Sequence, residues 1–174
     1  MLFIPAGTAG NVTIKGVDFE IPDQYGQGTL KESSYVYQSG FTFRILSLED
    51  SKNLKINFGD DFLEAKSHEE TQIAGHDAVV IHNSFNGKNY TTIYTPIADK
   101  IFLICFNDTE VNDDISGMLS KLPAQNMTHD EFSNSLNTAL SDYEDQVSQE
   151  KADIEAEDFY RSNKPTNRFF FFSF

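Results

Sequence analysis

The sequence predicts an α/β (α+β) fold, in which a mainly antiparallel β-sheet is covered by helices and followed by a long, acidic, amphipathic C-terminal helix. Three observations predict it: strand-like runs over residues 71–106, helical periodicity after residue 107, and a helix-start motif at residue 128. No apolar run reaches the ~20 residues that a membrane-spanning helix needs, so we expect no membrane span.

Residues 71–106 are typical of three consecutive strands joined by tight turns. The pair Asn86-Gly87 between two such runs predicts a hairpin, because both central residues of a type I′ turn need positive φ. Residues 101–106 are apolar at every position, which predicts a central strand covered on both faces. Pro96 cannot donate to a ladder, so we expect it to end its strand or to lie at an edge.

Shorter elements are predicted before this segment. Residues 12–22 alternate apolar and polar around Gly16, a pattern typical either of a half-buried strand pair or of one strand with a bulge at the glycine. Residues 35–48 predict a further hairpin. Residues 55–58 are a short strand candidate, and residues 60–68 are expected to form one or two helical turns.

Helical periodicity begins after residue 107. Apolar residues recur at helical spacing from Val111 to Leu122, and Pro123 ends the run. We expect this helix to cover the strand over residues 101–106.

Thr128 and Glu131 then form a capping box, and Met127 and Phe132 stand at the positions of a hydrophobic staple.

The second helix is predicted to continue to about Tyr160, which makes it roughly 50 Å long at ~1.5 Å per residue. A compact domain of 125 residues is only about 35 Å across, from its radius of gyration. The helix must therefore break, wrap around the domain or project from it. The gap in the apolar pattern between Val147 and Ile154 is where we expect packing to thin.

We divide the chain into a sheet domain (1–125), an acidic helix (126–160) and a basic, aromatic tail (161–174). The net charge of −14 argues against nucleic acid and anionic membrane surfaces as partners, because phosphate binding needs a basic footprint. Four Asn-x-Ser/Thr motifs, at Asn11, Asn89, Asn107 and Asn126, slightly favour an extracytoplasmic or membrane-associated location over a cytoplasmic one.

The sequence contains no catalytic signature and no cofactor fingerprint, so we predict no catalytic residue and no cofactor. Asp61, Glu64 and His68 would share one face of a helix and are the candidate metal ligands. No cysteine or second histidine joins them at metal spacing, which favours a solvated face. His76 and Asp77 suggest a base with an orienting carboxylate, but adjacent residues of a strand point to opposite faces, and a turn is the favoured reading.

The order of the predicted elements, and two short runs within it, resemble those of a known protein family. The run Gly16-Val-Asp-Phe19-Glu-Ile21-Pro22-Asp-Gln-Tyr25 and the strand entry Ile73-Ala-Gly75-His-Asp-Ala78 resemble the PsbP/Mog1-like group, especially the small PsbP-related proteins of methanogenic archaea. The resemblance covers residues 12–123. It implies an antiparallel sheet flanked by helices and a non-catalytic binding or assembly module, often exported or membrane-tethered.

We therefore expect a non-enzymatic module that binds a protein partner through its C-terminal helix and tail. The predicted partner-binding residues are Phe132, Leu136, Leu140, Tyr143, Val147, Phe169, Phe170, Phe171 and Phe172. Peripheral contact of the tail with a lipid surface and self-association of the helix are further options. The alternative function is a small-ligand or metal-binding protein, or an enzyme, that uses carboxylates with His68 or His76 in a cleft.

Overall fold

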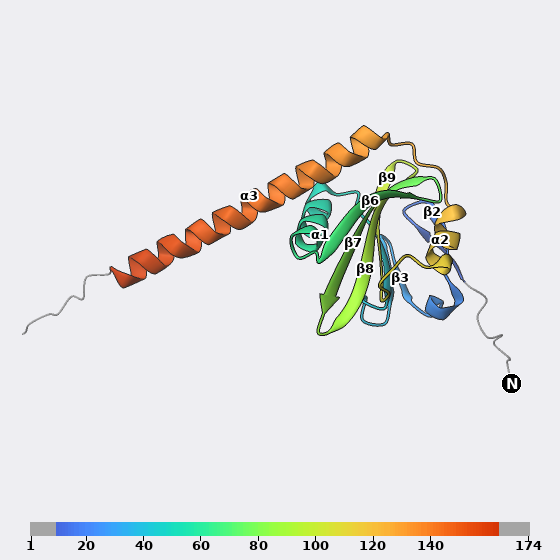
Figure 1. Cartoon of the computed structure of the whole chain (residues 1–174), viewed down its shortest axis with the longest axis horizontal. Helices are drawn as coiled ribbons and strands as arrows, with labels where there is room; N and C mark the ends of the chain where they lie inside the picture. The colour runs from blue at the N-terminus through green and yellow to red at the C-terminus, as the bar shows by residue number, and fades with distance from the viewer. Residues whose placement is uncertain (1–9, 164–174) are drawn as a thin grey trace, which may run out of the picture.

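The computed structural model describes residues 10–163, which form an open, seven-stranded antiparallel sheet with three α-helices (Figure 1). The predicted fold class is confirmed. In spatial order the strands are β3 (Thr29–Lys31), β4 (Ser34–Tyr37), β5 (Phe43–Ser47), β9 (Lys100–Phe106), β8 (Lys88–Ile97), β7 (His76–Phe85) and β6 (Ser67–Ile73).

The centre of the sheet matches its prediction. β7 and β8 are joined by the turn Asn86-Gly87, in which φ is +50° and +75° as a type I′ hairpin requires. β9 is the middle strand of the seven, and residues 101–106 are buried. The β4–β5 hairpin over residues 34–47 is also confirmed.

Pro96 lies inside β8, a central strand, and not at an edge. The β7–β8 register ends at Val79 and Tyr94, so the ladder needs no donor from Pro96 on that side. A side chain contacts the Pro96 carbonyl oxygen there: His76 Nδ1 lies 3.0 Å from it, within hydrogen-bond distance.

One face of the sheet is covered by the hairpin of β1 (Asn11–Ile14) and β2 (Val17–Glu20), by a 3₁₀ turn (Asp23–Tyr25) and by α2 (Asp113–Ser120). The strand-pair interpretation of residues 12–22 is therefore the correct one, with the turn at Lys15-Gly16. Ile115, Met118 and Leu119 of α2 share a buried cluster with alternate residues of β9, as expected.

The opposite face is covered by α1 (Ser51–Leu63) and by the beginning of α3 (His129–Ser162). The strand predicted over residues 55–58 is wrong, because this segment lies inside α1. Asp50 caps the helix by accepting a hydrogen bond from the Lys52 amide at 2.8 Å. Leu54, Phe58 and Phe62 then recur every four residues, which places them on one helical face.

α3 begins with the predicted capping box: Thr128 Oγ1 accepts from the Glu131 amide at 3.2 Å, and Glu131 Oε2 accepts from the Thr128 amide at 2.8 Å. The helix is continuous over 34 residues and projects well beyond the sheet (Figure 1). Packing ends earlier than predicted, since every residue from 144 to 162 is exposed.

Candidate functional site

The first half of α3, residues 129–143, is docked on the sheet domain. Phe132, Leu136 and Ala139 are buried in the same cluster as Leu54 and Phe58 of α1 and the residues of β7, β8 and β9 that face them. This half of the helix is therefore part of the core, although it lies beyond the expected domain boundary at residue 125.

Gly59 of α1 sets the distance between the two helices. A Cβ added at Gly59 would lie 2.2 Å from Cγ of Tyr143 and 2.5 Å from its Cβ, so the Tyr143 ring uses the space that only glycine leaves. The Tyr143 hydroxyl donates a hydrogen bond to Asp60 at 3.1 Å. The contact fixes how α3 leaves the domain.

The predicted partner-binding residues differ in how far this packing buries them. Phe132 and Leu136 are buried against the protein's own sheet, Leu140 is half-buried, and Tyr143 contacts α1. Val147 is exposed, at 41%. The other predicted members, Phe169, Phe170, Phe171 and Phe172, lie outside the described residues.

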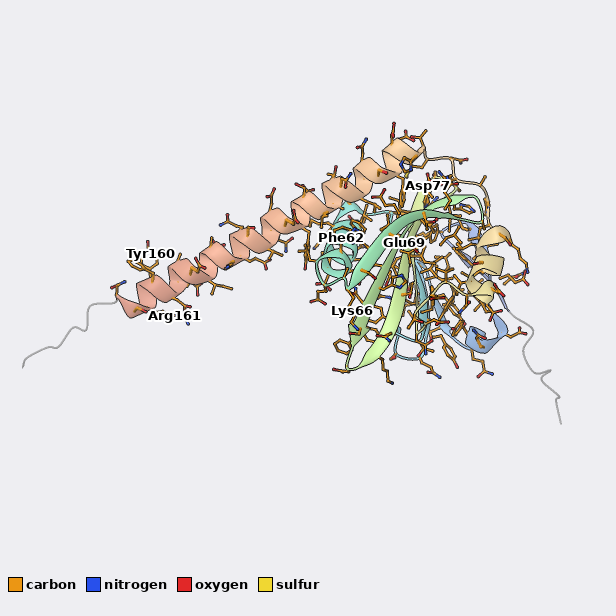
Figure 2. The ribbon with its side chains drawn as sticks, in the orientation of Figure 1. Phe62, Lys66, Glu69, Asp77, Tyr160 and Arg161 are labelled. Carbon is orange, nitrogen blue, oxygen red and sulfur yellow. The ribbon has the colours of Figure 1, made fainter. Side chains whose placement is uncertain are left out.

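The second half of α3, residues 144–162, is exposed throughout and is here called the projecting half. It holds seven acidic and two basic residues, a net charge of −5. Val147 and Ile154, the latter 62% exposed, are seven residues apart and so lie on one face. The projecting half ends near Tyr160 and Arg161 (Figure 2).

A cavity of about 600 Å³ lies where the docked half of α3 meets α1, the edge strand β6 and its neighbour β7. Its apolar wall is formed by Phe58, Phe62, Phe132, Leu136 and Leu140. Its polar wall includes Glu70, Gln72, Asp77, Gln125, His129 and Ser133. Figure 2 shows Asp77 near the start of α3 and Phe62 on α1, on either side of this region.

Asp77 is the best-connected polar group of the cavity. Its side chain is 7% exposed, and its carboxylate accepts hydrogen bonds from Gln72 Nε2 at 2.9 Å and from Gln125 Nε2 at 2.8 Å. His129 Nδ1 lies 3.5 Å from Oδ2 of the same carboxylate. The bonds from Gln125 and Gln72 hold the pKa of Asp77 below its ordinary value, so the group is an anion at neutral pH.

The candidate metal ligands do not share a helical face. α1 ends at Leu63, and His68 lies in β6 with its ring 4.4 Å from that of Phe62. Asp61 accepts a hydrogen bond from the Tyr94 hydroxyl at 2.6 Å, and burial raises the pKa of its carboxyl group. Glu64 is exposed. Residues 10–163 contain no group of three or more metal-ligating side chains placed to hold an ion.

Neither histidine of the predicted cleft lines this cavity. His76 is buried on the opposite face of the sheet and bonds to Pro96, while Asp77 points to the cavity side, as strand geometry predicts. The histidine that lies beside Asp77 is His129, and Ser133 follows it one helical turn later. Within the described part of the chain no hydrogen bond joins His129 to Ser133.

Sequence reasoning missed Gln72, Gln125 and His129. Gln125 is 48 residues from Asp77 and precedes α3 in an irregular segment, where it accepts from the Asp77 amide at 2.7 Å. No local pattern carries this contact.

No described helix is long and apolar enough to cross a membrane. Comparisons of the chain with protein-family models, curated protein sequences and solved structures return no match.

Proposed function

We propose that the protein is a non-enzymatic binding module that presents the projecting half of α3 to a protein partner with a basic surface. One observation carries the proposal. Residues 144–162 continue a helix that is anchored by its first half, every one of them is exposed, and none belongs to either buried cluster. An exposed helical segment of this length adds little to the packing of the sheet domain.

The docked half explains how the projecting half stays helical. Isolated helices shorter than about 12–15 residues are marginal in water, because the first turn is costly to form. Here the first turns are formed by the packing of Phe132 and Leu136. Further along, side-chain pairs at i and i+4 add support, including Gln146 to Glu150 and Gln149 to Asp153, both at 2.8 Å.

The charge of the projecting half indicates a partner with a basic surface. A net charge of −5 on one exposed helix attracts a basic surface and repels nucleic acid. It also opposes close pairing of two parallel copies of α3 at low salt. Val147 and Ile154 supply an apolar strip that the partner can cover.

Two sequence features support the same proposal. The resemblance of residues 12–123 to the PsbP/Mog1-like group implies a non-catalytic binding or assembly role, and it remains a prediction. The basic, aromatic tail, residues 161–174, is proposed to extend the interaction or to contact a lipid surface.

Photo-crosslinking tests the proposal. A benzoylphenylalanine placed at Gln149, in the projecting half, is compared in the source cell with one placed at Leu30, which is 49% exposed on β3 at the opposite side of the sheet. We expect a discrete adduct with a basic protein from position 149 only, weakened by added salt because exposed charges are screened. Equal adducts from both positions, or none from position 149, would contradict it.

A further inference from the structure

The cavity at the base of α3 lies apart from the projecting half. Partner binding through the projecting half therefore does not involve it. Its volume of about 600 Å³ lies within the range of small-molecule sites, about 300–1,000 Å³. Such sites place polar groups that orient the ligand beside apolar surface. Here the apolar groups come mainly from α1 and α3, and the polar groups, which make up slightly more than half of the lining, come from β6, β7, the segment before α3 and α3 itself.

The polar wall carries negative charge. Asp77 is buried and is held by two glutamine side chains, so its carboxylate is fixed in place. Glu70, on the neighbouring strand, is exposed, and its side chain has no hydrogen-bond or ion-pair partner among residues 10–163. No lysine or arginine is found among the described residues that line the cavity. The carboxylates of Asp77 and Glu70 would repel a bound anion. A bound cation could pair with the Glu70 carboxylate.

The apolar wall is suited to the body of the same ligand. Phe58, Phe62 and Phe132 border the cavity from two helices, and aromatic rings attract organic cations through their faces as well as by apolar contact. Leu136 and Leu140 extend this wall along α3. The two walls together are complementary to a molecule with one positive and one apolar end.

We propose that this cavity binds a small organic cation with an apolar body, such as an aromatic or alkyl amine, with its ammonium group at Glu70 and its body against Phe62 and Phe132. The site takes charge complementarity from Glu70 and Asp77 and selects size by the space between α1, α3 and β6. Because it lies beside the docked half of α3, it is separate from the surface proposed for the protein partner.

The test uses the full ¹⁵N-labelled chain and three probes of similar size: phenethylamine, phenyltrimethylammonium and the anion 3-phenylpropionate. We expect the two cations at millimolar concentration to shift the amide signals of Gln72, Asp77 and His129, and the anion to leave them in place. Like-charge repulsion accounts for the difference. Equal shifts from all three probes, or no shift from the cations, would overturn the proposal.

Three variants separate the site from non-specific attraction by an acidic protein. Glu70→Gln removes the free carboxylate and is expected to weaken phenethylamine about two- to fivefold, the range for one exposed ion pair. Glu144→Gln makes the same charge change beyond the cavity and is expected to leave affinity unchanged. Ser133→Phe fills the cavity from the half-buried face of α3 and should abolish binding. Equal effects of the two glutamine variants, or unchanged binding in Ser133→Phe, would place the amine elsewhere.

Discussion

At the residue scale, Asp77 shows how one buried carboxylate joins three elements. It belongs to β7, receives a hydrogen bond from Gln72 of β6, and is tied to Gln125 before α3 through both its side chain and its backbone amide. Removing it leaves two glutamine donors facing each other, and an unsatisfied buried polar group costs about 1–3 kcal/mol. Asp77 therefore couples the sheet edge to the start of α3.

The pH dependence of stability tests this role. The folded pKa of Asp77 is lowered, so its stabilisation is complete above the unfolded value of about 3.9 and is lost as pH falls through the lower folded value. We expect Asp77→Asn to reduce the free energy of unfolding by about 1–3 kcal/mol at pH 7, and by less at pH 3. Urea titrations at both pH values measure this.

The control for Asp77→Asn is Glu64→Gln, an equal charge change at an exposed carboxylate, which should stay within about 0.5 kcal/mol of the unmodified protein. A loss for Asp77→Asn that is the same at both pH values would show that the carboxylate charge is not what the glutamines stabilise.

At the element scale, the local signals in the sequence predicted the elements whose cause is itself local. Asn86-Gly87 forms a turn because of its own φ angles, and Thr128 and Glu131 cap α3 by bonding to each other. The strand prediction for residues 55–58 was wrong because Lys-Ile-Asn-Phe alternates like a strand over these four residues alone. The helix is set over a longer segment, by the cap at Asp50 and by the four-residue spacing of Leu54, Phe58 and Phe62. The Asp77–Gln125 contact depends on tertiary structure and no short pattern contains it.

The close approach of α1 and α3 gives a prediction for glycine. Gly59→Ala places a methyl group inside the Tyr143 side chain, so the helices must separate, and we expect a loss of about 1–3 kcal/mol in the free energy of unfolding. Gly117→Ala in α2 is the matched control. Nothing lies within 4 Å of its added Cβ, and it should stabilise by up to about 1 kcal/mol through helix propensity. Thermal unfolding of the pair checks this, and a harmless Gly59→Ala would mean that α3 does not dock here.

At the scale of the whole molecule, the structural unit ends within α3 and not at residue 125. A truncation after Gln146 keeps Phe132, Leu136 and Tyr143, and we expect its free energy of unfolding to stay within about 0.5 kcal/mol of the full chain. A truncation after Gln125 removes these side chains and exposes the sheet face beneath, costing several kcal/mol, since one large buried apolar side chain contributes about 2–5. Denaturant titration distinguishes the two, and equal stability of both truncations would contradict the docked arrangement.

The charge of the molecule and the direction of α3 both agree with the proposed function. The sheet domain holds the helix by one half, and the other half carries its acidic residues away from the domain (Figure 1). The sequence predicted the length and charge of this helix. It did not show where packing ends, because Tyr143 docks against Gly59, whereas Val147 continues the same apolar spacing and is 41% exposed.

The most direct measurement combines stability and binding in one variant. Val147→Ser with Ile154→Ser, in the chain that carries the crosslinker at Gln149, removes the apolar strip of the projecting half and nothing from the core. We predict an unchanged midpoint of thermal unfolding and a strongly reduced yield of the partner adduct. An unchanged yield, or a lowered midpoint with the yield retained, would show that this half of α3 is not the surface that the protein offers to a partner.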